Sequence, residues 1–234
     1  MSPTRYSEGD GEAAISLLRL LQLVSPGLPV GAYAYSRGQE WAVHAGWLNN
    51  EAQVADWVLG LLNHSLAYLD IPVLARLHEA WAKGDQPSVR YWNAFLFASR
   101  ESAEIQAEES HMGRALVRLL ADLDMEGARD WMAYSCVTYA TAFSMAAAQW
   151  KIPLSQTCSG YAWAWAESQV AAAVKLVPLG QTAGQRILTR VVMAIPDAVN
   201  RGKNVCDNDI GYSNIGLACA SALHEIQHTR LFRS

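Results

Sequence analysis

Residues 155–174 read SQTCSGYAWAWAESQVAAAV, a stretch of alanine and other small residues set around large aromatic ones. Alanine has the highest helix propensity, and runs of β-branched residues are scarce in this stretch and in the rest of the chain. Alanine faces, here at 171–173 and again at 146–148, let helix axes approach closely, while tryptophan side chains fill the wider gaps. The stretch therefore predicts a long helix packed inside an all-helical protein.

Signals for helix starts and ends divide the rest of the chain in the same way. Asn50 with Gln53 has the form of a capping box, as has Ser36 with Gln39, and Pro72 suits the first turn of a helix that begins at Asp70. No Asn-Gly or Asp-Gly turn joins two alternating segments, so strands are not indicated. The predicted fold is all-α, a single domain of roughly ten packed helices. The predicted helices cover residues 14–24, 36–46, 50–68, 70–84, 88–99, 101–123, 127–150, 155–174, 181–200 and 213–232.

The composition narrows the class of protein. The chain has 234 residues, of which 51% are hydrophobic and 17% charged, with a net charge of -4. This is a globular composition, long enough to bury a core. A mildly acidic chain without runs of Lys or Arg argues against nucleic-acid binding as the main function.

Targeting signals are missing from the sequence. Residues 1–12 are polar and lack the basic and apolar regions of a signal peptide, so we expect a disordered lead-in there. The most apolar region, residues 161–179, is interrupted by Glu167, Lys175 and Pro178, which argues against a membrane span. The four cysteines, which have no C-x-x-C spacing, suit reduced thiols. These features predict a cytoplasmic protein that has no membrane partner.

The end of the chain contains the pattern H-E-x-x-H, formed by His224, Glu225 and His228. On a helix this pattern holds zinc in metalloproteases, with the glutamate as general base. A catalytic zinc needs a third protein ligand, and residues 229–234 contain no His, Cys, Asp or Glu. We therefore favour a solvated or partner-facing helix, with no metal and no cofactor, and keep a zinc peptidase as the alternative.

The last residues form a second candidate site. Arg230, Leu231, Phe232 and Arg233 follow the final predicted helical core, and an isolated helix end of this kind frays. Arginine and aromatic residues are also enriched at interface hot spots. Residues 222–234 are therefore predicted to be a tail that is disordered alone and becomes ordered on a partner.

Other polar groups carry no recognisable chemistry. No phosphate-binding loop, dinucleotide fingerprint or nucleophile elbow is present, so no catalytic residue is predicted. Glu104, Glu108 and Glu109 share a helix face that by default is solvated, with an acidic partner surface as the alternative. Residues 28–35, LPVGAYAY, predict an ordered loop, because its prolines restrict the backbone and its tyrosines can pack.

A series of short segments runs along the chain: residues 28–31 (LPVG) with Tyr35 and Ser36, Glu40 with Trp41, residues 45–47 (AGW), Arg100 with Glu101, residues 174–178 (VKLVP), and the closing residues 224–234. In their order and spacing, these segments resemble the urease accessory proteins of the UreF family, from about Leu18 to Ser234. The family pattern most often has Gly at position 32, Ser at 34 and Leu at 39, where this chain has Ala, Ala and Gln.

The resemblance implies an all-helical, homodimeric metallochaperone scaffold that is not an enzyme. Such a scaffold would join UreD (also called UreH) and the GTPase UreG to deliver nickel to apo-urease, and would modulate GTP hydrolysis by UreG. A helical adaptor for another GTPase is the remaining alternative. Residues 13–221 would form the domain and 222–234 the docking tail.

The resemblance also assigns residues to partners. Lys175, Glu40, Arg100 and Glu101 would couple to UreG, with a snorkelling lysine on a buried helix as the alternative for Lys175. The tail would bind UreD/UreH through Gln227, Arg230, Leu231, Phe232 and Arg233. Pro29, Gly31, Tyr33, Tyr35 and Ser36 would shape the structural loop.

Overall fold

The computed structural model describes residues 8–234, and these contain helices but no strand. The prediction of an all-α single domain is confirmed. The α-helices are α1 (Glu8–Leu23), α2 (Gln39–His44), α3 (Glu51–Gly60), α4 (Ile71–Lys83), α5 (Gln86–Ala98), α6 (Ala103–Asp122), α7 (Ala128–Trp131), α8 (Tyr139–Gln149), α9 (Leu154–Leu176), α10 (Gln181–Lys203) and α11 (Ile215–His224). Two short 3-10 helices, η1 (Ala32–Ala34) and η3 (Asp207–Asp209), and one π-helical segment, η2 (Leu61–Asp70), are also present.

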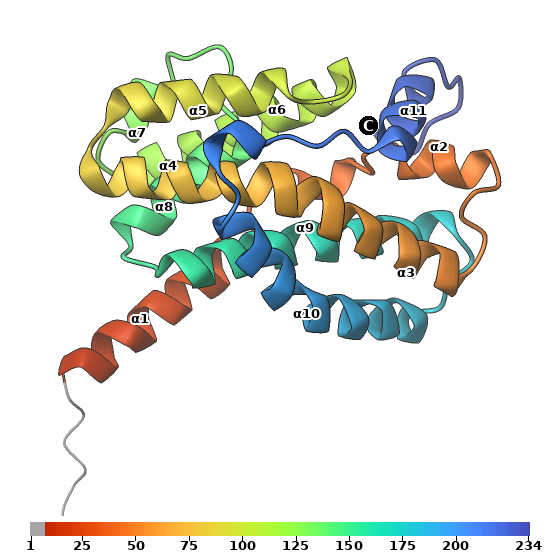
Figure 1. Ribbon diagram of the computed structural model, residues 1–234, viewed down its shortest axis with the longest axis horizontal. Coiled ribbons are helices and arrows are strands. Elements are labelled where there is room, and N and C mark those ends of the chain that lie inside the picture. The colour runs from red at the N-terminus through yellow and green to blue at the C-terminus, as the bar shows by residue number, and fades with distance from the viewer. Residues whose placement is uncertain (1–7) are drawn as a thin grey trace, which may run out of the picture.

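Helix α9 forms the middle of the bundle, and α3, α4, α8 and α10 pack against it (Figure 1). Helices α5 and α6 cover the outer sides of α4 and α8. Helix α1 extends away from the body, at the lower left of Figure 1. The C-terminus lies beside α2 and α11, so the tail ends against the body of the domain.

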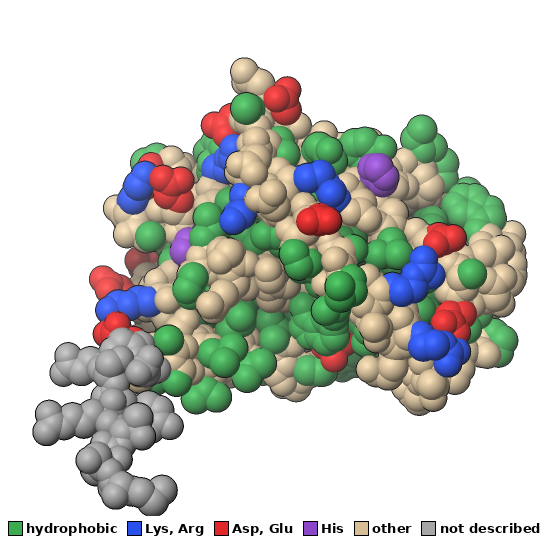
Figure 2. Space-filling model, turned by 60° about the horizontal axis from the view of Figure 1, so that its bottom comes forward, with side chains coloured by type: hydrophobic (Ala, Val, Ile, Leu, Met, Phe, Trp, Pro, Cys, Tyr) green, Lys and Arg blue, Asp and Glu red, His purple; other side chains and the backbone are tan. Residues whose placement is uncertain are grey.

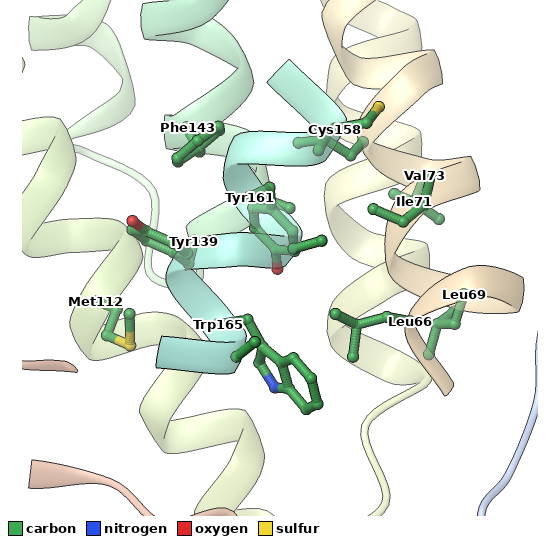
Figure 3. Packing of buried hydrophobic residues seen from close by; sticks show 14 of the residues in the cluster. Leu66, Leu69, Ile71, Val73, Met112, Tyr139, Phe143, Cys158, Tyr161 and Trp165 are labelled. Atoms are coloured by element: carbon green, nitrogen blue, oxygen red, sulfur yellow. The ribbon is translucent and has the colours of Figure 1, made fainter. Parts of the chain in front are cut away.

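The core is built around the aromatic side chain of Tyr161 on α9. Figure 3 shows Tyr161 between Tyr139 and Phe143 of α8 on one side and Ile71 and Val73 of α4 on the other. The ring centroids of Tyr139 and Phe143 lie 5.9 and 5.4 Å from that of Tyr161. Such offset and edge-on pairs contribute beyond the area they bury. The helix predicted over 155–174 is thus present and central.

The predicted boundary between helices 50–68 and 70–84 is wrong, because α3, η2 and α4 form one continuous helix. Asp70 has helical φ and ψ of -66° and -49° and does not cap anything. Pro72 has no N–H to bond to the carbonyl of Tyr68 one turn earlier, and that carbonyl accepts a hydrogen bond from the Gly211 N–H instead, at 2.9 Å. The π-helical turns of η2 widen the helix just before the proline.

This continuous helix, residues 51–83, is the one segment of residues 8–234 with the length and apolar composition to cross a membrane. Within its most apolar window, 72% of residues are buried in the bundle. Core helices of globular domains have the same property.

The prediction of one long helix over 127–150 is also wrong. Residues 132–138 are not helical, and they separate α7 from α8. Thr138 caps α8 by accepting a hydrogen bond from the Thr141 N–H at 3.3 Å. The Asn93 side chain holds the extended residues, donating to the Cys136 carbonyl and accepting from the Thr138 N–H, both at 2.9 Å. A Cβ atom on Gly113 would lie 2.0 Å from the Val137 carbonyl oxygen, so glycine permits this close approach.

Two expectations near the N-terminus need correction. Residues 8–12 of the expected lead-in belong to α1, and residues 1–7 lie outside the described part of the chain. The capping box at Ser36 does not form, because the Ser36 N–H donates to the Ser234 carbonyl at 2.8 Å. The buried amide of Gln39 has no hydrogen-bond partner among residues 8–234. By contrast, the predicted cap at Asn50 is confirmed by its bond from the Gln53 N–H at 3.1 Å.

Candidate functional site

The C-terminal tail is ordered and paired with the loop that follows α1. Helix α11 ends at His224, ten residues before the chain does. The Arg233 N–H then donates to the Ala34 carbonyl at 2.9 Å, and the Ser36 hydroxyl donates to the Ser234 carbonyl at 2.5 Å. The expectations of a helix to 232 and of a tail disordered alone are therefore wrong, because the loop backbone satisfies the tail backbone.

Glu40 on α2 fixes the tail from the other side. Its two carboxylate oxygens accept hydrogen bonds from the backbone N–H groups of Leu231 at 2.6 Å and of Phe232 at 2.8 Å. Glu40 is buried, with an exposed fraction of 7%. Hydrogen bonds to a charged acceptor are about twice as strong as neutral ones, and they offset the cost of burying the carboxylate. Glu40 thus acts within the chain.

His224 lies between two glutamates and is completely buried. Its Nε2 is 3.3 Å from Glu40, its Nδ1 is 2.6 Å from Glu104, and Glu104 also pairs with Arg230 at 2.5 Å. The prediction of a solvated or partner-facing helix is wrong for His224. The exposed His228 lies beyond the end of α11, so the two histidines do not form a helical pair.

The zinc-peptidase alternative requires His224 and His228 one turn apart on the same helix, and the structure does not place them so. The two glutamates face opposite nitrogens of the His224 ring and cannot converge on one ion. Within residues 8–234, no group of three His, Cys, Asp or Glu side chains is arranged to hold a metal.

A buried network of charges lies behind the tail. Arg37, which follows the loop, donates to Glu108 at 2.7 Å and to Glu109 at 3.0 Å on α6. Arg100 donates to the same Glu109 at 2.5 Å and to Asp70 at 2.7 Å. The solvated face predicted for α6 is wrong, since Glu108 is 4% exposed and Glu109 fully buried. The free Glu108 oxygen accepts the Ser234 hydroxyl at 2.9 Å, which joins the network to the chain end.

The two charged residues of the Arg100-Glu101 motif differ in their positions. Arg100 is 6% exposed, so it supports the fold and does not present a contact surface. Glu101 is partly buried beside it, and one of its carboxylate oxygens has no hydrogen-bond partner among the described residues. Burial raises the pKa of Glu101. Because Arg100 is buried, its coupling to a partner would be indirect, and the coupling predicted for both residues remains a prediction.

The Asp70 carboxylate gives the network a dependence on pH. Burial alone would raise the pKa of Asp70, but the charge and hydrogen bonds of Arg100 outweigh burial and lower it. A lowered pKa in the folded state means that Asp70 stabilises the protein above its ordinary pKa, and that this contribution is lost as pH falls through the lowered value.

We therefore expect the unfolding free energy of the wild type to fall more steeply with acidification than that of Asp70→Asn. The difference in slope below about pH 4 should approach the linkage limit of about 1.4 kcal/mol per pH unit for one proton. Urea unfolding at a series of pH values measures both slopes. Parallel slopes would show that Asp70 is not held as a carboxylate by Arg100.

The loop from Leu28 to Ser36 has the ordered conformation that the sequence predicts. Gly31 has a φ of 76°, which glycine adopts without strain, and Pro29 is exposed before it. Tyr35 is 5% exposed, and its hydroxyl lies 3.0 Å from Nδ1 of His111, whereas Tyr33 is 78% exposed. The loop therefore anchors one tyrosine and presents the other.

A cavity of about 180 Å³ lies between this loop and α9. Most of its lining is apolar, including Val30 and Trp165. The Arg37–Glu108 pair and Lys175 are the charged groups nearest the tail in that lining. The cavity thus connects the loop, the buried network and the end of α9.

Lys175 is exposed in the last turn of α9, which agrees both with a partner contact and with the alternative of a snorkelling lysine on a buried helix. Its Nζ lies over the ring of Phe232, 5.7 Å from the ring centroid. Phe232 is 6% exposed, while its neighbours Leu231 and Arg233 face solvent. We call the exposed group of Tyr33, Lys175, Leu231 and Arg233 the tail face.

The structure thus brings together three segments that the sequence analysis treated separately. The loop, Lys175 and the tail meet at the tail face, with Glu40 directly beneath it. Gln227 lies outside this contact, and its side-chain NH2 donates to the Thr229 carbonyl at 2.9 Å. The roles of Arg37, Asp70 and Ser234 were not predicted, because these residues pair with groups distant in the chain and no local motif marks them.

Comparison with known proteins gives one consistent result. The family model for UreF matches residues 48–192. A protein of Alkalilimnicola ehrlichii is 50% identical over 216 residues, covering 92% of this chain and 95% of its own length. Proteins of Azoarcus sp. (49% over 227 residues, 94% and 96% covered) and Marinobacter nauticus (44% over 234 residues, all of both chains) are similar too. All three are called urease accessory protein UreF. The chain belongs to the UreF family.

Proposed function

We propose that this protein is a non-catalytic scaffold in urease maturation, which joins UreD/UreH and the GTPase UreG to deliver nickel to apo-urease. Membership of the family and the name of its relatives support a role as an accessory protein. The observation that carries the finer proposal is the convergence of the loop, Lys175 and the tail on one face. We further propose a cytoplasmic location, no bound cofactor, and no nucleic-acid or membrane partner.

The tail is proposed as the docking site for UreD/UreH. Leu231 is 67% exposed, and it stands beside two exposed arginines, Arg230 and Arg233. The backbone of this segment is already fixed by Glu40 and by the loop. A preorganised segment loses less conformational entropy on binding than a disordered one, so its exposed side chains can contribute more fully to affinity.

Lys175 is proposed as the contact for UreG. Within residues 8–234 no carboxylate pairs with its ammonium group, which leaves the charge free for an acidic group of the GTPase. Arg100, Glu101 and Glu40 then act indirectly, by holding the charged network and the tail beneath this surface. UreG is proposed to change its rate of GTP hydrolysis when it binds here.

Reconstitution tests the scaffold role. Purified apo-urease, UreD/UreH, UreG, GTP and nickel would be incubated with and without this chain. We expect urease activity to appear only when the chain is present. Equal activity in both mixtures would reject the proposal, and activity that appears with this chain but without UreG would favour a different partner.

Helix α1 is proposed as part of a homodimer contact. Four of its apolar side chains are more than half exposed: Ile15, Leu17, Leu18 and Leu21. The opposite face of the same helix packs on the body, where Leu20 lies against Gly160. Figure 2 shows the underside of the molecule with hydrophobic side chains across its middle and many charged ones nearer its rim. An apolar helix face of this kind marks an interaction surface.

We expect the wild-type chain to have twice its 25.6 kDa chain mass in light scattering, and the variant Leu18→Asp/Leu21→Asp to be monomeric. Charges placed in an apolar interface are desolvated without a partner, which is costly. Met193→Asp is the control, since Met193 is 77% exposed on α10. A double variant that stays dimeric, or a monomeric wild type, would contradict the proposed contact.

A further inference from the structure

We infer that Phe232 is a positioning residue for Lys175. The position of the tail on the domain thereby determines the orientation of the Lys175 ammonium group. This inference rests on the proposed function, in which the tail binds UreD/UreH and Lys175 binds UreG. It adds that the two partner sites share one physical contact, the ammonium of Lys175 over the ring of Phe232.

The ring is fixed independently of the lysine. The Phe232 N–H donates to Glu40 at 2.8 Å, and the next residue, Arg233, donates its N–H to the Ala34 carbonyl at 2.9 Å. Phe232 is 6% exposed, so its ring has one position as long as the tail is seated. These anchors use the backbone of the tail, and the Phe232 ring itself takes part in none of them.

The lysine, by contrast, has little else to fix it. Its side chain is long and flexible, it is exposed in the last turn of α9, and among residues 8–234 no carboxylate pairs with it. A cation over an aromatic face at a partly exposed site shifts a population by a factor of about two to five. Phe232 is therefore the contact that favours one orientation of Lys175.

The contact links the position of the tail to the partner that binds Lys175. Because the tail is seated in the chain alone, the Phe232 ring already favours one orientation of Lys175. The affinity for a partner that binds this orientation is raised by the same factor. UreG is therefore expected to bind about two- to five-fold more tightly than it would without the ring.

The first test needs no partner. In the full chain, ring currents of Phe232 should shift the Lys175 ε-CH₂ protons upfield in ¹H–¹³C NMR spectra. Phe232→Leu should remove the shift and Phe232→Tyr should retain it. Protected amides at Leu231 and Phe232 in hydrogen exchange would show that the Leu variant keeps its tail seated. An unchanged Lys175 signal in Phe232→Leu would overturn the inference.

The second test measures the affinity of UreG for the wild type, Phe232→Tyr and Phe232→Leu. We expect Phe232→Tyr to bind UreG as the wild type does, and Phe232→Leu to bind it about two- to five-fold more weakly. If Lys175→Ala weakens UreG binding but Phe232→Leu binds as tightly as the wild type, this inference fails and the proposed function stands. If Lys175→Ala leaves UreG binding unchanged, the proposed UreG site fails, and with it this inference.

Discussion

Replacing Arg100 with Met should lower the free energy of unfolding by about 3–5 kcal/mol, the usual cost of removing one member of a buried ion pair. Arg100 donates to both Asp70 and Glu109, and the side chains of all three are at most 2% exposed. Without the guanidinium, the carboxylates of Asp70 and Glu109 remain buried in the core with too few hydrogen-bond donors to balance their charge. Urea unfolding of the wild type and the variant measures the difference.

Arg129→Met is the matched control. Arg129 also pairs with an aspartate, Asp124 at 3.1 Å, but both side chains are more than three-quarters exposed. An exposed pair of this kind contributes about 0–1 kcal/mol, so the control should unfold nearly as the wild type does. A loss below about 1 kcal/mol in Arg100→Met would contradict the account of the buried network. The result also decides how a loss of urease activation in an Arg100 variant is interpreted, because an unstable scaffold fails without losing any direct contact.

Replacing Glu40 with Gln should release the tail from the domain. Two backbone N–H groups, those of Leu231 and Phe232, now donate to one carboxylate. Each hydrogen bond to a charged group contributes about 1.5–3 kcal/mol, and a neutral amide replaces only part of this. We expect hydrogen exchange at these two amides to accelerate by at least about ten-fold, while amides in the core of α9 keep their protection.

Glu79→Gln serves as the control for Glu40→Gln, because Glu79 is an exposed glutamate whose partner is Lys83 on the same helix. It should leave exchange in the tail unchanged. Equal exchange rates at Leu231 and Phe232 in the wild type and in Glu40→Gln would mean that the loop alone holds the tail. In that case the bonds from Arg233 to Ala34 and from Ser36 to Ser234 would be sufficient.

Local sequence signals predicted most of the helices. The alanine-rich stretch at 155–174 and the cap at Asn50 act through residues that are close in the sequence, so a linear pattern contains them. The errors arose where distant residues decide. Pro72 stays inside a helix because Gly211 satisfies the carbonyl that proline leaves free, and α8 starts late because Asn93 holds residues 136–138 extended.

The candidate site was predicted in its parts but not in its arrangement. The resemblance to the family selected Lys175, Glu40 and the tail, yet it could not show that they touch. Glu40 and Phe232 lie 192 positions apart in the sequence. The same limit explains His224, whose spacing from His228 suggests a zinc site although its ring is buried between Glu40 and Glu104. A pattern gives residue types, whereas burial and pairing follow from the packed fold.

The proposed function depends most on the docking of UreD/UreH to the tail, through the side chains that its seated backbone presents. The double variant Leu231→Ala/Arg233→Ala tests it directly, because Glu40 and the loop hold backbone groups that this variant keeps. Leu123→Ala/Arg129→Ala removes the same residue types from an exposed site at the far end of α6.

The measurement is the affinity of each full-length chain for UreD/UreH, with tail seating checked by hydrogen exchange. Interface hot spots contribute about 1–2 kcal/mol or more each, so we expect the tail variant to bind UreD/UreH at least ten-fold more weakly than the wild type. We expect wild-type affinity for the control. Equal affinity of the tail variant and the wild type, with the tail still seated, would contradict the proposed docking.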